Sequence, residues 1–221
     1  MNDPLGFGFD FAGQRFIARA SGALWWPQRQ MLVVSDLHLG RSERYARRGG
    51  ALLPPYEVTD TLARLSAEIA ALQPQTLVSL GDGFDDIAAG EALAGENRAS
   101  LAAIARQCDL IWVQGNHDPA QGKADLPGRF LAEIAGAPAL RHEAGEAPDI
   151  SGHFHPSTLL AGKRWRCFVK GADHLILPAF GTYTGGLDIS AAPLAALAPK
   201  GIAILCAPRP FCRPMPKSAK G

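Results

Sequence analysis

Three short strand-like runs each end in a cluster of polar residues, and this pattern constrains the fold more than any other feature of the sequence. The runs lie in "MLVVSDLHLG" (31–40), "TLVSLGDGFDD" (76–86) and "LIWVQGNHDP" (110–119). Helix-like segments separate them, so the order is β-α-β-α-β. Such alternation predicts a mainly parallel sheet with flanking helices and right-handed crossovers. Because open α/β sheets bind ligands at the carboxyl ends of their strands, the polar clusters are expected to meet at one edge.

The helices between these strands are predicted from apolar periodicity. In "YEVTDTLARLSAEIAAL" (56–72) apolar residues recur at alternating spacings of four and three, as on the buried stripe of an amphipathic helix. This stripe consists of Val58, Leu62, Leu65, Ile69 and Leu72. A second helical segment is predicted near "EALAGENRASLAAIARQ" (91–107), directly before the third strand.

Outside this unit the predicted elements are mostly strands. The segment "RFIARASGALWWPQRQ" (15–30) favours a hairpin with Trp25 and Trp26 as packing residues. Beyond Pro138 short strands are predicted in "ALRHE", "DISGHFH", "KRWRCFVK", "DHLILPAF" and "GIAILCAP". The arginine-rich segment "GRSERYARRGGALLPP" (40–55) is predicted to be a loop, and residues 209–221 a flexible tail. With no repeat or domain boundary visible, residues 1–221 are expected to form a single domain.

Charge and cysteine usage argue against several classes of protein. The 22 Lys and Arg residues nearly balance 21 Asp and Glu residues, and the net charge of +1 creates no global field towards nucleic acid or anionic membrane. The four cysteines lack a C-x-x-C pair, which disfavours a zinc knuckle or a redox motif. The N-terminus lacks the pattern of a signal peptide, and no apolar stretch approaches roughly 18 residues. We therefore expect a cytoplasmic protein without a membrane partner.

The polar residues at the strand ends suit the binding of divalent cations. They are Asp36, His38, Asp82, Asn116, His117 and Asp118, and "GHFH" adds His153 and His155 downstream. Any one cluster alone fits a turn, a helix cap or a solvated histidine, but their agreement in position favours a joint role. Carboxylates, an amide oxygen and imidazoles form a mixed shell that Mn, Fe, Co, Zn or Ni accepts more readily than Mg. A shared carboxylate such as Asp82 can bridge two ions.

The "GHFH" pair raises its own question of geometry. In an extended strand His153 and His155 would point to the same face, with Phe154 turned to the other. Two histidines at this spacing are more often structural than metal-binding. The pair therefore gains weight as a ligand pair only from the clusters upstream.

As an ordered set, these motifs resemble the signature of the calcineurin-like metallophosphoesterases: D-x-H, G-D, G-N-H-D or E, a lone His, and G-H-x-H. Every element occurs here in order between Asp36 and His155. The resemblance implies a four-layer αββα sandwich that holds two divalent metal ions, with Mn expected first. It also implies that one ion is held by Asp36, His38, Asp82 and His155, and the other by Asp82, Asn116, His142 and His153.

The same resemblance implies catalytic roles for two residues of the third motif. His117 matches the histidine that contacts the phosphate and protonates the leaving alkoxide, and Asp118 matches the carboxylate that orients it. An imidazole with a pKa near neutrality suits such a proton transfer. The acidic pair Asp85 and Asp86 is read either as support for the site or as a solvated turn.

One branch of the superfamily is more similar, the ligase-associated DNA damage response endonucleases, through "DLHLGRSERYARRGGALLPPYEVTDTLARL" and "SGHFHP". Membership implies a phosphodiesterase that acts on DNA in a pathway with a DNA ligase and a helicase. The arginines after the first strand would either clamp flanking phosphates or form a solvated basic loop; they are Arg41, Arg44, Arg47 and Arg48. A small site suits single-stranded or distorted DNA better than a long duplex.

Three alternatives stay open at the level of sequence. A small-molecule or nucleotide phosphoesterase would carry the same signature. A UDP-sugar lipid pyrophosphatase needs an apolar lid, for which the short separation of Asp118 and His142 leaves little room. A non-catalytic scaffold is disfavoured, because every ligand position and His117 carry suitable residues.

Overall fold

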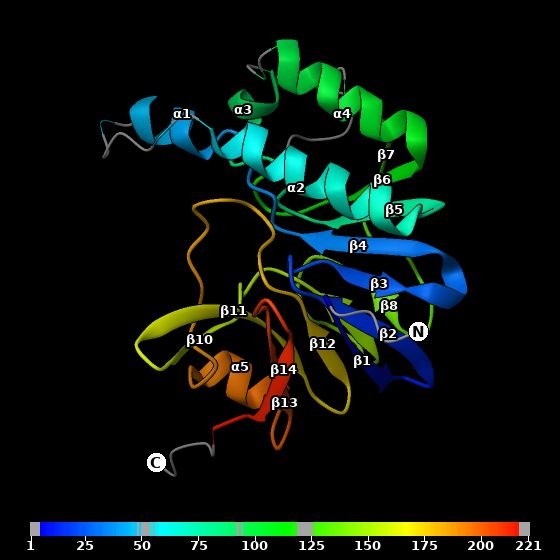
Figure 1. The fold of residues 1–221 in the computed structure, drawn as a ribbon, viewed down its shortest axis with the longest axis vertical. Coiled ribbons are helices and arrows are strands. Elements are labelled where there is room, and N and C mark those ends of the chain that lie inside the picture. Colours follow the sequence, from blue (N-terminus) through cyan, green and yellow to red (C-terminus); the bar gives the residue numbers. More distant parts are fainter. Residues whose placement is uncertain are drawn as a thin grey trace.

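Two seven-stranded β-sheets form the centre of the molecule, with helices on both outer faces (Figure 1). The computed structural model describes residues 5–47, 49, 54, 56–91, 93, 95–118 and 126–216. The layers follow one another as helices, sheet, sheet and helix. This arrangement confirms the predicted αββα sandwich.

The first sheet joins an N-terminal antiparallel half to the predicted parallel unit. Its strands lie in the order β1 (Gly6–Phe11), β2 (Gln14–Arg19), β3 (Leu24–Trp26), β4 (Met31–Ser35), β5 (Thr76–Leu80), β6 (Asp109–Val113) and β7 (Arg129–Leu131). Strands β1 to β4 pair antiparallel, and β4 to β7 pair parallel. The predicted hairpin is formed by β2 and β3. A short 3-10 helix (Pro27–Arg29) then connects β3 to β4. Trp26 is fully buried.

The second sheet is mixed and comes from the C-terminal half of the chain. Its strands are β14 (Phe211–Pro214), β13 (Ile202–Leu205), β11 (Lys163–Lys170), β12 (His174–Ile176), β9 (Asp149–Ser151) and β8 (Ala139–Leu140), with β10 (Ser157–Leu160) paired to β11. Strand β9 is parallel to β8 and β12, whereas the other pairs are antiparallel. Residues 211–214 were expected in a flexible tail, but their hydrogen bonds to β13 make them an edge strand.

The helices cover the two outer faces unequally. Helices α1 (Arg41–Arg47), α2 (Glu57–Leu72), α3 (Ile87–Glu91) and α4 (Gly95–Gln107) lie beside the first sheet, and α5 (Ala192–Leu197) beside the second (Figure 1). The predicted stripe of α2 is confirmed, since Val58, Leu62, Leu65 and Ile69 are buried and Leu72 packs against the same cluster. None of the helices described is long and apolar enough to cross a bilayer.

Helix α1 corrects the prediction of a loop in residues 40–55. Residues Arg41–Arg47 are helical, and Glu43 lies in the first turn, where a negative charge favours the helix dipole. Arginine, glutamate and alanine are good helix formers, so the basic composition of this segment was a poor indicator of a loop.

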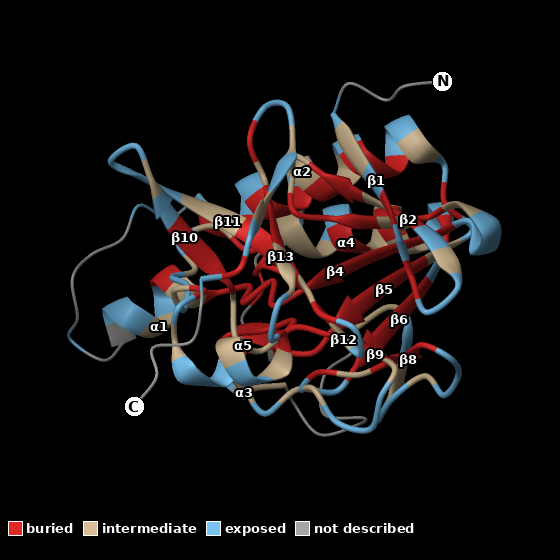
Figure 2. Ribbon diagram, turned by 90° about the horizontal axis from the view of Figure 1, so that it is seen from below, coloured by how far each residue is buried: buried red, intermediate tan, exposed pale blue. Residues whose placement is uncertain are grey.

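Three apolar clusters hold the layers together. Strand alternation turns Val33 of β4 into the core between the sheets, and Leu32 and Val34 towards α2 and α4. A third cluster joins β11 and β13 to α5. The central strands are almost wholly buried in Figure 2. Each buried Val or Leu contributes about 1.5 to 3 kcal/mol, so this packing holds the loops at the strand ends in a defined place.

Candidate metal centre

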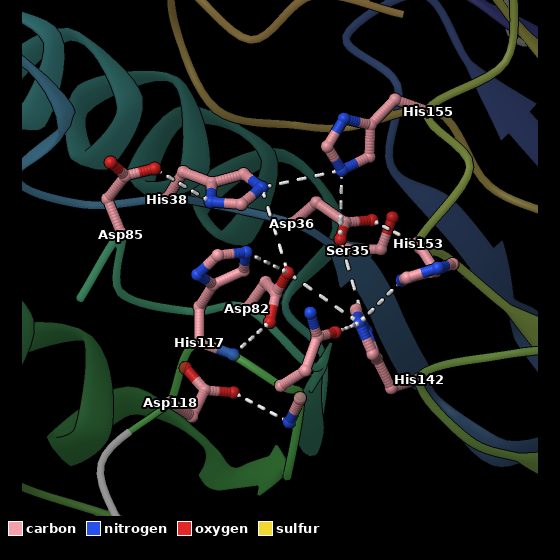
Figure 3. A network of polar contacts seen from close by, with 12 residues as sticks. Ser35, Asp36, His38, Asp82, Asp85, His117, Asp118, His142, His153 and His155 are labelled. Carbon is pink, nitrogen blue, oxygen red and sulfur yellow. Dashed lines mark hydrogen bonds and ion pairs between the residues drawn. The ribbon is translucent and has the colours of Figure 1, made fainter. Parts of the chain in front are cut away.

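The polar residues that follow β4, β5 and β6 lie together at one edge of the first sheet (Figure 3). The parallel register pairs Ser35 with Leu80 and Leu80 with Val113, so the three strands end side by side. The segments that leave these ends carry Asp36, His38, Asp82, Asn116 and His117. The expectation that three successive polar clusters meet at one edge is therefore confirmed.

The second sheet brings three more histidines to the same edge. His142 follows β8, and His153 and His155 follow β9, which ends before both of them. The φ angles of His153 and His155 are 66° and 46°, which place both residues in the left-handed region. The prediction that a strand alternates these two side chains is therefore wrong. Left-handed turns instead direct one ring towards His142 and the other towards His38.

The first cluster of ligand atoms comes from Asp36, His38 and His155. Nε2 of His155 lies 3.1 Å from Oδ1 of Asp36 and 3.4 Å from Nε2 of His38. Two ligand atoms bound about 2.1 Å from one ion lie about 3.0 to 3.4 Å apart, so these separations suit a shared ion. Oδ1 of Asp36 is buried and accepts no hydrogen bond from the described residues, whereas Oδ2 accepts one from the backbone N–H of His153. A cation would offset the cost of burying this oxygen.

The second cluster comes from Asn116, His142 and His153. Nε2 of His142 lies 2.8 Å from Oδ1 of Asn116 and 3.1 Å from Nδ1 of His153. Nδ1 of His142 lies 3.1 Å from the carbonyl oxygen of Leu80, which can only accept a hydrogen bond. In the neutral imidazole Nδ1 therefore donates, and Nε2 presents its lone pair to the other ligand atoms. Metal-binding histidines commonly donate their second N–H to a carbonyl in this way.

Asp82 connects the two clusters. Its Oδ2 lies 3.6 Å from Nε2 of His142 and 4.0 Å from Nε2 of His38. Its Oδ1 accepts a hydrogen bond of 2.9 Å from the backbone N–H of His117, which fixes the carboxylate plane. Ligand atoms of Asp36, Asp82 and His142 also lie within 4.8 Å of one another, so the two clusters are contiguous. The donor set thus fits two neighbouring cations with Asp82 between them.

Asp36 is held in its ionised form even without a cation. Burial raises its pKa, but contacts with His155, His142 and His38 lower it by more, so the pKa lies below its ordinary value. A carboxylate must be ionised to bind a metal. The protein therefore prepares this ligand for binding at neutral pH.

The backbone of the site is strained where the ligands sit. Five of the seven predicted ligand residues have positive φ angles, between 45° and 66°: Asp36, His38, Asp82, His153 and His155. The left-handed conformation costs a non-glycine residue about 1 to 2 kcal/mol. Such strain accumulates at functional sites, where the surrounding structure holds it in place.

Two glycines allow the two sheets to approach each other at this edge. A Cβ atom at Gly81, in the first sheet's half, would collide with the ring of His142 from the second. A Cβ atom at Gly152, in the second sheet's half, would collide with Oδ2 of Asp36 from the first. A larger residue at either position would therefore displace a ligand of the opposite sheet.

His117 borders the ligand clusters and is open to solvent. Its side chain is 38% exposed, and its Nε2 lies 4.0 Å from Oδ2 of Asp82. Its ring centroid is 5.8 Å from that of His38. The imidazole is therefore accessible from solvent at the border of the ligand clusters.

Asp118 has a different role from the one predicted. Its carboxylate was expected to orient His117, but Oδ2 accepts a hydrogen bond of 2.9 Å from the backbone of Gly115 and Oδ1 one of 3.1 Å from that of Phe84. Burial raises the pKa of Asp118, and these backbone hydrogen bonds only partly offset the rise. Asp118 therefore ties the loop after β6 to the loop after β5, because both oxygens face backbone amides.

Asp85 supports the first cluster and is not part of a solvated turn. It is fully buried, and its Oδ1 lies 3.0 Å from Nδ1 of His38, although the two groups are not aligned for a hydrogen bond. Burial raises the pKa of Asp85, but His38, Arg44 and Arg41 lower it by more, so that the pKa falls to about 2. A carboxylate behind a histidine ligand keeps the proton on Nδ1 and leaves Nε2 free for a metal. The acidic pair after G-D was the sequence signal for this support.

The arginines after β4 are not on an open loop. Arg44 donates a hydrogen bond of 2.8 Å to Oδ2 of Asp85, and Nε of Arg41 lies 3.4 Å from Oδ1. Both side chains are at most one-fifth exposed. These two arginines therefore pair with Asp85 behind His38, so they do not lie in a solvated loop. The side chain of Arg47 and the whole of Arg48 lie outside the described residues.

The whole fold is similar to that of a solved nuclease. No protein-family model matches the sequence, and no curated protein matches it. The structure matches the crystal structure of the Pseudomonas putida nuclease MPE with a TM-score of 0.72 and 26% sequence identity. The match covers 95% of this chain and 99% of that one, so the likeness extends over nearly the entire fold.

Proposed function

We propose that this chain is a metal-dependent phosphodiesterase that cleaves DNA. The observation that carries the proposal is the convergence of seven oxygen and nitrogen ligands from both sheets, with Asp82 shared between two clusters. Two cations about 3.5 to 4 Å apart are the usual arrangement for in-line hydrolysis of phosphoesters. A mixed shell with four histidines suits Mn, Fe, Zn, Co or Ni. Mn is placed first because the family resemblance implies it.

The side chains of the site have two kinds of role in this proposal: most of them hold the metal ions, and one transfers a proton. When bound, two divalent ions supply a water of lowered pKa and neutralise the phosphate oxygens. Asp36, His38, Asp82 and His155 hold one ion, and Asp82, Asn116, His142 and His153 hold the other. Nε2 of His117, beside Asp82 and open to solvent, donates the proton that the leaving alkoxide needs. Asp118 positions the loop that carries His117.

A nucleic acid as the substrate rests on the likeness to the Pseudomonas putida nuclease MPE, which spans nearly both chains. DNA in particular rests on the resemblance to the ligase-associated branch. A diester with a nucleoside leaving group needs a proton donor, and His117 is available for this step. Single-stranded or distorted DNA suits the small edge site. In this proposal the enzyme acts in DNA repair beside a DNA ligase and a helicase, as the resemblance to the ligase-associated branch implies.

Hydrolysis of two model substrates tests the activity. The metal-free protein is reconstituted with Mn²⁺ and assayed on bis(p-nitrophenyl) phosphate, a diester, and p-nitrophenyl phosphate, a monoester. We expect the diester to be preferred and Asp82→Ala to lose about 1,000-fold or more of the activity, because metal ions contribute several kcal/mol to catalysis. Asp10→Ala, which removes an exposed carboxylate on β1, serves as the matched control.

Single-stranded and duplex oligonucleotides are then compared in the same buffer. Cleavage of the single strand or of a mismatched duplex, lost in Asp82→Ala and kept in Asp10→Ala, would support the proposed nuclease. Hydrolysis of the monoester alone would instead favour a small-molecule phosphomonoesterase, and undiminished activity in Asp82→Ala would rule out the metal site.

A further inference from the structure

A second group of arginines lies beside the ligand clusters, on strand β11 of the second sheet. A pocket of about 200 Å³ opens next to His155, between Arg164 and Arg166 on one side and the segment 184–186 on the other. None of the described residues that line it is acidic. In a chain whose net charge is only +1, two guanidinium groups beside the site are a local concentration of positive charge.

Arg166 is tied directly to the backbone of the ligand edge. Its guanidinium donates to the carbonyl oxygens of Phe180 at 3.2 Å and Gly181 at 2.7 Å. The amides of these two residues donate in turn to the carbonyl oxygens of Ser35 and Asp36. Arg166 is thus held at a constant distance from the first ligand cluster.

Arg164 has capacity left for a ligand. Its side chain is 54% exposed and donates a hydrogen bond of 3.0 Å to the hydroxyl of Ser157. The carboxylate of Asp188 lies 3.8 Å away, beyond hydrogen-bond distance. On the same pocket, Oγ1 of Thr184 is buried and has no hydrogen-bond partner among the described residues. A ligand with several acceptor oxygens would use these donors.

A second pocket continues the positive surface away from the ligand clusters. Arg164 and Arg166 line it as well, and it adds Lys163 and Arg64. Arg64 pairs with Asp60, the one acidic residue among the described lining, at 3.1 Å. Burial and the neighbouring Arg64 lower the pKa of Arg166, as expected of cations held close together. The two pockets therefore form one positive track that begins at His155.

We propose that this track, defined by Arg164, Arg166 and the two pockets they line, binds the phosphate backbone of the DNA strand beside the scissile bond. The inference rests on the proposed nuclease function and names the surface that positions its substrate. Planar guanidinium groups suit phosphate oxygens, and backbone contacts of this kind position a strand without reading its sequence. Arg41 and Arg44, in contrast, form ion pairs with the buried carboxylate of Asp85.

Binding to the metal-free protein provides the first test, because it does not depend on catalysis. The probe is a short fluorescein-labelled single-stranded oligothymidylate, followed by fluorescence anisotropy. We expect Arg164→Gln to raise its Kd about five- to tenfold and to reduce the salt slope by about 0.7, the value for one lost phosphate contact on a single strand. The matched control is Arg15→Gln, which makes the same charge change at a 49% exposed position on β2.

Kinetics with Mn²⁺ provide the second test. Arg164→Gln should lower kcat/KM for the oligonucleotide several times more than kcat/KM for bis(p-nitrophenyl) phosphate, because the small diester has no neighbouring phosphate. Equal losses for the two substrates, or binding equal to that of Arg15→Gln, would overturn the proposal that the track binds DNA. If the wild-type protein hydrolyses neither substrate, the proposed nuclease function itself fails. If it cleaves the small diester but neither binds nor cleaves DNA, the phosphodiesterase stands and the track is overturned.

Discussion

The two sheets contribute to the same site in different ways. The first sheet presents Asp36, Asp82 and Asn116 beyond the ends of parallel strands, whose hydrogen-bonded register places them side by side. The second sheet presents His153 and His155 from a turn of left-handed residues after β9. The register of parallel strands therefore brings the ligands of the first sheet together, whereas those of the second depend on an irregular loop. Left-handed residues occur among the ligands of both sheets.

The contacts within the site cross from one sheet to the other. In the first cluster His155 of the second sheet contacts Asp36 and His38 of the first. In the second cluster His142 contacts Asn116 in the same way. Neither sheet alone assembles a complete ligand set, so the site exists only when the core between the sheets is packed.

Removing one ligand from each cluster is the strongest test of this division. His155→Ala should lose the ion of the first cluster, and His153→Ala the ion of the second, so that the Mn²⁺ stoichiometry falls from two to one in each case. Both variants should lose about 1,000-fold of diester hydrolysis, because the shared phosphate needs both ions. Metal analysis after dialysis measures the stoichiometry. Loss of both ions in either variant would show that the clusters are not separable.

The glycine at the junction of the sheets tests their close approach. Gly81→Ala should destabilise the fold by about 2 to 4 kcal/mol, because its φ of 71° is unfavourable for alanine and its Cβ would collide with the ring of His142. Gly13→Ala has the same φ of 71° with nothing within 4 Å of the added Cβ, so it measures the backbone strain alone. Urea unfolding gives both values. Equal destabilisation of the two variants would argue against the collision with His142.

His117 belongs to the first sheet's half but binds no ion in this scheme, which separates proton transfer from metal binding. His117→Ala should keep both ions and lose about 100-fold of activity on diesters with poor leaving groups. The loss should be much smaller for a nitrophenolate, which leaves without a proton. A series of aryl and alkyl diesters measures this dependence, and a loss independent of the leaving group would contradict the role of proton donor.

Asp85 tests how far the first sheet's half depends on groups behind the ligands. Asp85→Asn should weaken Mn²⁺ binding to the first cluster about 10- to 100-fold, because the carboxylate that holds His38 and Arg44 loses its charge. Asp10→Asn makes the same change at an exposed position and should leave binding unaltered. Calorimetric titration compares the two. Unchanged affinity in Asp85→Asn would show that Asp85 only anchors α1.

Prediction from sequence succeeded where local pattern and sheet geometry agree. The apolar stripe of α2 and the three strands with polar ends led to the correct layers and to one ligand edge. Prediction from sequence failed where it relied on composition instead of periodicity. Residues 41–47 of the arginine-rich segment form α1, and residues 211–214 form β14, although both were expected to lack regular structure.

For the functional residues too, some features could be predicted from the sequence and others could not. The seven expected ligands converge, but the partners of the residues beside them could not be inferred from the sequence. Asp118 was expected to contact its neighbour His117, and it instead contacts backbone amides of two loops. Arg41 and Arg44 were expected either to clamp phosphates or to lie in a solvated loop, and they pair with a buried carboxylate. Partners of this kind come from distant segments, which leave no periodic signal.

The sequence by itself determined the chemistry of the site and half of its geometry. Ligand types and their order are written in the chain, and parallel strands necessarily end at a common edge. Only the tertiary structure decided how His142, His153 and His155 reach that edge, because left-handed turns and contacts between two sheets depend on packing across the core. The same packing placed Arg164 and Arg166 beside the ligands, at a position that their sequence separation from Asp36 does not reveal.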